Sequence, residues 1–232
     1  MMELKKISIL SVEFNVSLTR EEFPVLNEVI ENNLGLSGII KRWKETEVGN
    51  YVHPVCQYKN VEAKTCLFCY GMIPFPVRNL FTDTDWYVWI RPRKELFKVS
   101  EVKFRSAEIG VTDSYYQYNI RDWVFGSKDR GSFGHSDSLQ KEADKFLRRD
   151  VLHGLEILGA DTSEGVDTIV VDIYQGNRTG GDESDSLTFY DIEFVSNVVF
   201  PGFFSIGGGS DVGFGVISLK KNTQEYSQSG GR

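Results

Sequence analysis

Residues 200–217 read FPGFFSIGGGSDVGFGVI and form the most distinctive segment of the chain. Glycine adopts positive φ angles and allows two backbones to approach closely. Consecutive amides in such a loop can form a concave nest for phosphate oxygens. No Gly-Lys-Ser or Gly-Lys-Thr follows the glycines, which excludes a P-loop, and no helix pattern follows, which excludes a dinucleotide-binding loop. A plain glycine-rich hairpin before a last strand at 216–219 stays an open alternative.

The sequence upstream of this segment alternates between strand and helix patterns. Residues 138–158 place apolar side chains on one side of a long amphipathic helix. Residues 168–174 and 187–195 have the composition of strands, and the polar stretch 177–186 between them predicts a turn. The C-terminal part is therefore expected to contain a helix, two strands, the glycine-rich segment and a final strand.

The N-terminal part is expected to contain a strand, a helix and then further strands. Residues 6–16 alternate apolar and polar side chains, as a half-buried strand does. Thr19 and Glu22 form a capping-box pattern before a helix that Gly35 is expected to end. Strand patterns follow at 52–71, with a hairpin turn expected around 59–62, and again at 86–90 and 99–110. Residues 127–137 have the texture of a linker or exposed loop.

This order predicts an α+β protein made of two tandem ferredoxin-like domains, each a split βαβ unit, with a C-terminal glycine-rich loop. We expect an N-terminal domain at 1–126 and a C-terminal domain at 127–222 that carries the loop. The polar tail 223–232 is expected to be disordered.

The composition is that of a globular protein, with 232 residues, 41% hydrophobic and 25% charged. No apolar run is long enough to span a bilayer, and the N-terminus lacks the apolar core of a signal peptide, so we expect a cytoplasmic protein without a membrane partner. The chain has three cysteines, Cys56, Cys66 and Cys69, and an odd number argues against a disulfide framework. We therefore favour cysteines that are buried in strands. A zinc site would need a second cysteine pair, which the sequence lacks, and a redox pair is the other alternative.

Four segments together resemble the RAMP superfamily of CRISPR proteins, and most closely its branch that cuts repeat RNA. The glycine-rich loop is similar to the C-terminal signature of that family. Residues 51–59, YVHPVCQYK, are similar to its Tyr-Pro-x-x-Gln-Tyr-Lys strand. Residues 146–159 resemble the helix before its last sheet, and residues 187–194 resemble the strand after that helix.

The resemblance implies a protein that binds CRISPR repeat RNA and cuts it without a metal or another cofactor. The ribose 2′-hydroxyl would attack the adjacent phosphodiester and leave a 2′,3′-cyclic phosphate. That reaction needs a base, an acid and positive charge near the phosphorane. Other CRISPR effector subunits are further partners that the resemblance allows.

On this resemblance, His53 is the leading candidate for the base or the acid, because the histidine pKa lies near neutrality. Tyr51 and Lys41 are the other catalytic candidates, and Arg42 and Lys44 extend a basic cluster expected to bind RNA. The structural alternatives are a hydrogen-bonded strand histidine, a packed tyrosine and a solvated helix end.

Two further histidines rank below these candidates. His135 falls in the linker-like stretch, and His153 falls on the polar side of the long helix, where a surface role is favoured. No histidine pair has metal-ligand spacing, and no acidic cluster suits magnesium.

The loop and the long helix supply the remaining RNA-binding candidates. Family members commonly carry glycine at the position of Ser205, lysine at that of Gly208 and a basic residue near Val212, so the loop of this chain is less basic. Arg148 and Arg149 on the helix are expected to offset this loss partly. The loop positions expected to contact RNA are Gly207, Gly208, Gly209, Gly213 and Gly215.

The net charge of −7 weighs against a nucleic-acid partner, because phosphate contacts favour a basic surface. Three hypotheses therefore stay open: an endoribonuclease that matures CRISPR RNA, a non-cleaving RNA-binding subunit of an effector complex, and a relative that binds only proteins. The aromatic residues expected either to stack on bases or to fill the core are Trp86, Tyr87, Trp89, Tyr115, Tyr116, Tyr118 and Trp123.

Overall fold

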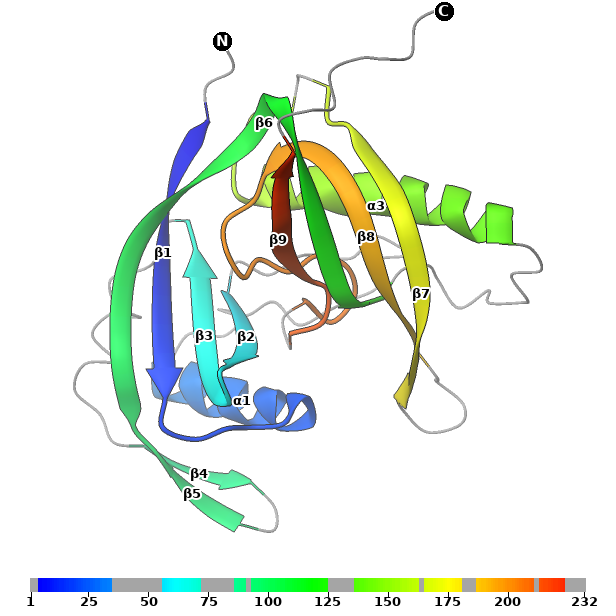
Figure 1. The fold of residues 1–232 in the computed structure, drawn as a ribbon. Coiled ribbons are helices and arrows are strands. Elements are labelled where there is room, and N and C mark those ends of the chain that lie inside the picture. The colour runs from blue at the N-terminus through cyan, green and yellow to red at the C-terminus, as the bar shows by residue number, and fades with distance from the viewer. Residues whose placement is uncertain are drawn as a thin grey trace, which may run out of the picture.

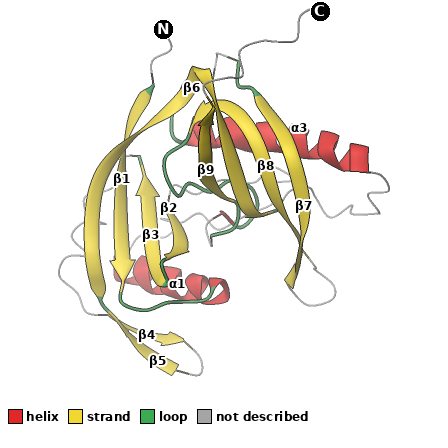
Figure 2. Cartoon of the chain, in the orientation of Figure 1, coloured by secondary structure: helices red, strands yellow, loops and turns green. Residues whose placement is uncertain are grey.

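The computed structural model describes residues 4–34, 56–71, 86–90, 93–124, 136–162, 165–180, 187–210 and 213–223. Within these residues it is a mixed α/β protein in which the sheets are antiparallel and the helices lie against them (Figures 1 and 2). Its elements are β1 (Lys5–Phe14), a 3-10 turn (Arg20–Glu22), α1 (Phe23–Leu34), β2 (Cys56–Val61), β3 (Lys64–Tyr70), β4 (Trp86–Ile90), β5 (Arg93–Phe97), β6 (Val99–Trp123), α3 (Ser136–Ile157), β7 (Thr168–Gly180), β8 (Leu187–Val199) and β9 (Val216–Thr223).

The strand β6 connects the two halves of the molecule. Seven strands form one sheet in the order β2-β3-β1-β6-β8-β7, and β9 also pairs with β6. The first part of β6 pairs with β1, and its second part pairs with β8 on one side and β9 on the other. β4 and β5 form a separate ribbon. The predicted division at residue 126 stays a prediction, but β6 ends three residues before it and pairs with strands of both halves.

Each half has a helix packed on its sheet. In the N-terminal half, Leu26 and Ile30 of α1 are buried against Leu10 and Val12 of β1. In the C-terminal half, α3 buries one side in a larger core, which continues onto the opposite face of β1 and β3. The side chains of α3 in this core are Ala143, Leu147, Val151 and Leu155.

The strongest sequence patterns match the structure. The alternating residues 6–16 correspond to β1, the amphipathic residues 138–158 to α3, and residues 86–90 to β4. At the start of α1, the Glu22 carboxylate accepts a hydrogen bond of 2.8 Å from the Thr19 amide, as the capping box predicts.

Four boundaries differ from the sequence predictions. The hairpin turn lies at Glu62 and Ala63, both with positive φ, rather than around 59–62. β6 continues thirteen residues past the expected end at 110. β7 continues to Gly180, so the predicted turn at 177–186 begins as strand, because these residues pair with β8. β9 ends at Thr223, which had been assigned to the tail.

The cysteines are buried in strands, as the sequence favours. Cys56 and Cys69 are cross-strand partners, and burial raises the pKa of the Cys66 thiol to about 11. Within the described residues, no group of three His, Cys, Asp or Glu side chains could hold a metal ion. No helix in the described part of the chain is long and apolar enough to cross a membrane.

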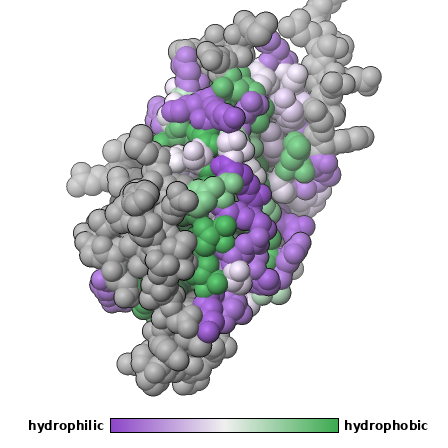
Figure 3. Space-filling view, turned by 90° about the vertical axis from the view of Figure 1, so that its left-hand side faces the viewer, coloured by the Kyte–Doolittle hydropathy of each residue, from purple (hydrophilic) through white to green (hydrophobic). Residues whose placement is uncertain are grey.

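The aromatic side chains of β6 mostly belong to the core. Tyr118 is buried and its hydroxyl donates to the Val198 carbonyl at 2.8 Å, and Trp123 is fully buried. The outer surface is mixed in character. On the face shown in Figure 3, hydrophilic side chains surround small apolar areas. Phe104 on β6 is one of the large apolar side chains that are exposed on the surface of the protein.

Candidate functional site

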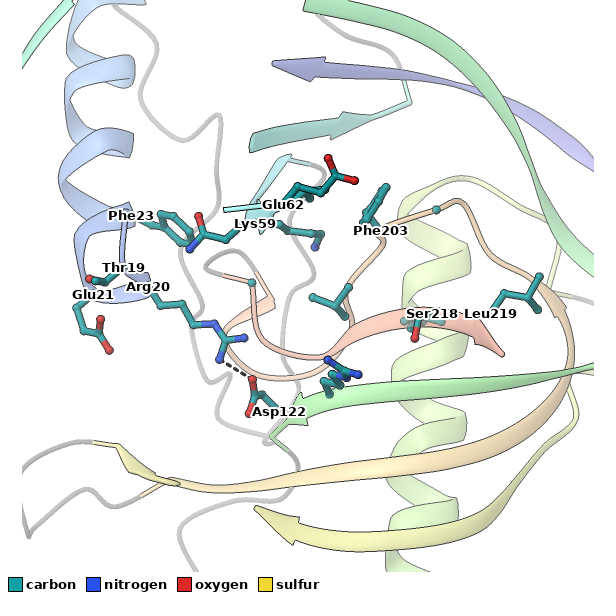
Figure 4. A pocket seen from close by; sticks show the side chains of 17 residues that line it. Thr19, Arg20, Glu21, Phe23, Lys59, Glu62, Asp122, Phe203, Ser218 and Leu219 are labelled. Carbon is teal, nitrogen blue, oxygen red and sulfur yellow. Dashed lines mark ion pairs between the residues drawn. The ribbon is translucent and has the colours of Figure 1, made fainter. Parts of the chain in front are cut away.

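A cleft of about 1000 Å³ lies where the two halves of the molecule meet (Figure 4). One wall comes from the start of α1 and from the turn between β2 and β3. The other wall comes from the end of β6, the glycine-rich segment and β9. Because segments far apart in the sequence build it, this cleft exists only in the folded chain.

The glycine-rich segment approaches other backbone so closely that side chains are excluded at two positions. At Gly215, which has φ +65°, an added Cβ would lie 1.9 Å from the Ile206 carbonyl oxygen. At Gly213, which has φ +83°, it would lie 2.9 Å from the Tyr58 carbonyl oxygen of β2. The glycines therefore allow the segment to fold onto itself and onto β2.

Several amides of this segment are already used within the protein. The Ile206 amide donates to the Gly215 carbonyl, the Gly208 amide to the Val124 carbonyl, and the Gly215 amide to the Arg121 carbonyl. A phosphate nest needs amides that point at the ligand. These bonds give the segment a packing role, and phosphate binding by its glycines remains a prediction.

Two buried side chains of β2 hold the segment in place. The Gln57 side chain accepts a bond of 2.9 Å from the Ser205 amide and donates one of 3.0 Å to the Ser205 carbonyl. The Lys59 ammonium donates to the Gln57 side chain at 2.8 Å and to the Ser205 hydroxyl. Lys59 is 3% exposed, yet it lines the cleft. A cation is thus fixed at the wall of the cleft by contacts across the two halves.

An ion pair closes the opposite end of the cleft (Figure 4). Arg20, just before α1, pairs with Asp122 at the end of β6, with 2.6 Å between the charged atoms. The Arg20 guanidinium also lies 4.5 Å from the centre of the Phe214 ring, a cation–π contact. The Asp122 amide, at a residue with positive φ, donates to the Asp191 carboxylate. These contacts join the start of α1 to the C-terminal half.

The charges at the cleft balance. Among its described lining residues, three are cationic and three are anionic. The cations are Arg20, Lys59 and Arg121, and the anions are Glu21, Glu62 and Asp122. Since phosphate attraction depends on a local basic excess, these six described side chains together give little net attraction for a phosphate.

A second, smaller groove of about 350 Å³ runs along α3. Its cations are Lys145, Arg148 and Arg149, and it also contains His153, whose pKa burial lowers. The Asp150 carboxyl beneath it is buried, and burial raises its pKa to about 6 although Arg149 opposes the shift. Asp150 accepts bonds of 2.9 Å from Arg149 and 3.1 Å from the Trp123 indole.

Trp123 connects this groove to the glycine-rich segment. A Cβ added at Gly207 would lie 2.6 Å from the Trp123 ring. The indole thus packs against the loop on one side and donates to Asp150 of α3 on the other. Arg149 is thus connected to the glycine-rich segment through Asp150 and Trp123, and it is not among the residues that line the cleft.

The structure places only some of the predicted site residues. The catalytic candidates His53, Tyr51 and Lys41, the RNA-binding candidates Arg42 and Lys44, and also His135 lie outside the described residues. Gly213 lines the cleft, whereas Arg148 and Arg149 line the α3 groove.

Sequence reasoning missed three residues of the cleft. Lys59 belongs to the motif YVHPVCQYK, so its place in that motif was the available signal. Arg20 and Phe203 carried no such signal, because their roles depend on contacts with distant segments.

The fold is shared with solved CRISPR proteins. The chain is similar to a Cas6b crystal structure with a TM-score of 0.71 and 15% identity, covering 93% of this chain and 100% of that one. A structure described as the CRISPR RNA processing endoribonuclease Cas6b matches with a TM-score of 0.63 and 16% identity, with the same coverage of both chains. Csf5, described as a CRISPR-Cas type IV Cas6 crRNA endonuclease, matches at 0.54 and 12% identity, covering 94% of this chain and 100% of that one. No family model and no curated protein matches the sequence.

Proposed function

We propose that this protein is an endoribonuclease that binds CRISPR repeat RNA and cuts it without a metal, as a cytoplasmic component of antiviral defence. The observation that carries the proposal is the fold shared with Cas6b over 93% of the chain. The cleft at the junction of the halves supports it, because Lys59 presents a fixed cation there. The sequence resemblance to the repeat-cutting RAMP branch points to the same activity.

The proposal includes two tandem ferredoxin-like units. In a split βαβ unit the first and third strands are neighbours, the second lies outside the third, and the fourth lies beside the first. The sheet orders β2-β3-β1-β6 and β7-β8-β6-β9 both fit this arrangement. On this interpretation β6 is the last strand of one unit and also supplies the first strand of the next, and the proposed division at residue 126 follows its end.

The proposed reaction is attack of a ribose 2′-hydroxyl on the adjacent phosphorus. A base takes the hydroxyl proton, the bond from phosphorus to the 5′-oxygen breaks, and an acid protonates that oxygen. The products are a 2′,3′-cyclic phosphate and a free 5′-hydroxyl. His53, Tyr51 and Lys41 are the proposed proton-transfer residues.

Lys59 is proposed to stabilise the negative charge that develops on the phosphorane. A hydrogen-bond donor stabilises the charge of a transition state most when the protein already holds the donor in position. The bonds from Lys59 to Gln57 and Ser205 supply that preorganisation.

The alternative that the sequence leaves open is a non-cleaving RNA-binding subunit of an effector complex. Such a subunit needs the fold and an RNA surface but no proton-transfer residues. It would bind the repeat RNA and leave it intact.

The test is incubation of the purified protein with its associated repeat RNA in EDTA, followed by separation of end-labelled products. One cut with a cyclic-phosphate end is expected, and a 2′-deoxy substitution at the cut nucleotide should abolish it. A wild-type protein that binds the RNA without cutting it supports the alternative. A protein that neither binds nor cuts the RNA contradicts both, and leaves a protein-interaction module that kept the fold.

A further inference from the structure

Phe203 occupies an unusual backbone conformation at the edge of the cleft. Its φ is +63°, in the left-handed region that a bulky residue rarely adopts. Such a conformation is unfavourable and persists where the surrounding structure enforces it, often at ligand sites. Phe203 also lines the cleft, where Figure 4 shows its side chain standing away from the glycine-rich segment.

A stack of aromatic rings supports the Phe203 side chain from below. Its ring lies on that of Phe68, with centroids 5.1 Å apart and planes at 23°. Phe68 is buried and stacks in turn on Tyr70. The Tyr70 hydroxyl donates to the carbonyl of Gly202, the residue that precedes Phe203. Both the ring and its backbone are therefore held from β3.

The ring of Phe203 nevertheless remains open to solvent. Phe203 is 39% exposed, whereas its neighbour Phe204 is fully buried. Phe68 stacks on one side of the ring, and Phe203 is among the residues that line the cleft. A planar apolar face that is rigid on one side and open on the other is what base stacking requires.

The balanced charges of the cleft favour a base over a phosphate as the group bound here. Among the described residues that line the cleft, three cations stand against three anions, so these side chains give the RNA backbone little net attraction. Stacking is independent of net charge and accepts any base, because every base has a π-face. Lys59 and Arg121 on the same cleft are the cations that a phosphate beside such a base would meet.

Resting on the proposed function, we infer that Phe203 is a stacking platform for one unpaired nucleobase of the RNA bound in the cleft. The proposed nucleotide is unpaired, because splayed-out bases of single strands stack on aromatic side chains, whereas a base inside a helix has both faces covered by its neighbours. This assigns a nucleobase subsite to the cleft and makes single-stranded RNA the class of ligand that enters it.

The test uses a short oligoadenylate RNA in which one adenine is replaced by fluorescent 2-aminopurine, and an abasic RNA of the same length. Binding is measured for the wild type, Phe203→Leu, Phe203→Gly and Phe203→Trp. Phe203→Leu keeps an apolar side chain without a π-face. Phe203→Gly removes the side chain and adopts the positive φ without strain. Phe104→Ala removes a ring that is 51% exposed on β6 and serves as the matched control. Thermal melting checks that each variant folds.

The expected result is quenched fluorescence on binding to the wild type and to Phe203→Trp. Phe203→Leu and Phe203→Gly should bind the oligoadenylate roughly 5- to 150-fold more weakly, the range that a lost base stack produces. The abasic RNA should bind all these variants equally, and Phe104→Ala should behave as the wild type does.

Wild-type affinity in both Phe203→Leu and Phe203→Gly would overturn the stacking role while leaving RNA binding, and with it the proposed function, intact. The same holds if the wild type prefers the abasic RNA. A wild type that binds neither these RNAs nor the repeat RNA would overturn the proposed function and this inference together.

Discussion

The cleft and the α3 groove differ in how they are built. The cleft joins segments from both halves, and one of its cations, Lys59 of β2, is almost completely buried against the glycine-rich segment. The α3 groove comes from a single helix and presents Arg148 in an exposed position. A buried and oriented cation suits catalysis, whereas an exposed one suits reversible attraction of a flexible polyanion.

This difference suggests a division of work between the two regions. Changes at the buried cation of the cleft should alter folding or the rate of cutting, changes at Phe203 should alter base stacking, and changes in the groove should alter the salt-dependent part of the affinity. Asp150 and Trp123 lie between the cleft and the α3 groove, so a substitution of Asp150 tests how strongly the cleft and the groove are coupled.

The largest effect is expected from Gly215→Val. The new Cβ would lie 1.9 Å from the Ile206 carbonyl oxygen, at a residue whose φ of +65° also disfavours valine. We expect a loss of more than about 3 kcal/mol in the free energy of unfolding, or no folded protein. For a chain of this length that corresponds to a fall in Tm of at least about 6 °C, measured by thermal melting.

The control for Gly215→Val is Gly165→Val, where no atom lies within 4 Å of the new Cβ. Its Tm should stay close to that of the wild type. Equal Tm values for Gly215→Val and the wild type would contradict the tight packing of the cleft wall.

The next largest effect is expected from Lys59→Met, which keeps a long apolar stem but removes the cation. Loss of one preorganised donor typically slows the chemical step by about 10²- to 10³-fold. We expect a fall of that order in the single-turnover cleavage rate at saturating RNA, with a much smaller change in affinity. The measurement is the rate in EDTA alongside a filter-binding titration.

Lys64→Met, at the start of β3 and paired with Glu13 in an exposed ion pair, is the matched control for Lys59→Met. It removes the same charge from the same hairpin and should leave the rate unchanged. If both variants cut at the wild-type rate while remaining folded, Lys59 serves only to hold Ser205.

The sequence predicted the regular elements better than the site. α3 follows from its periodicity alone, because it packs a single apolar face on a core. β1 was predicted as a half-buried strand, but the structure buries side chains on both of its faces. The second part of β6 was missed, because register shifts between Val111 and Tyr116 and between Ile120 and Trp123 interrupt the alternation. The motif around Lys59 was visible, but its contact with Ser205 spans 146 residues and has no local pattern.

A third effect is expected from the pH dependence of stability at Asp150. Burial raises the pKa of this carboxyl in the folded chain to about 6, above its value of 3.8 when solvated. The folded state therefore binds this proton more tightly, and the contribution of Asp150 to stability is greatest below pH 3.8 and is lost as pH rises through 6. A shift of this size corresponds to roughly 3 kcal/mol between pH 3.8 and 7.

Asp150→Asn removes the titrating group but keeps an acceptor for the Trp123 indole. The free energy of unfolding of the wild type relative to this variant should therefore decrease from pH 4 to 7, as measured by urea titration. A constant difference would mean that Asp150 does not titrate in this range. Cleavage that changes in parallel would show that the cleft and the groove are coupled through Trp123.

The smallest effect, and the one that separates the two regions, is expected from Arg148→Gln. Arg148 is exposed in the α3 groove, so its loss should remove about one phosphate contact. We expect affinity for the repeat RNA to fall a few-fold at low salt and the slope of log K against log salt to decrease in magnitude by about 0.7.

The control is Arg105→Gln, which removes an exposed arginine from the first part of β6 and should leave the slope unchanged. The cleavage rate at saturating RNA should be the same for both variants, because neither side chain lines the cleft. If Arg148→Gln instead slows cutting and leaves the salt slope intact, the groove belongs to the chemistry and the division between the two regions is wrong.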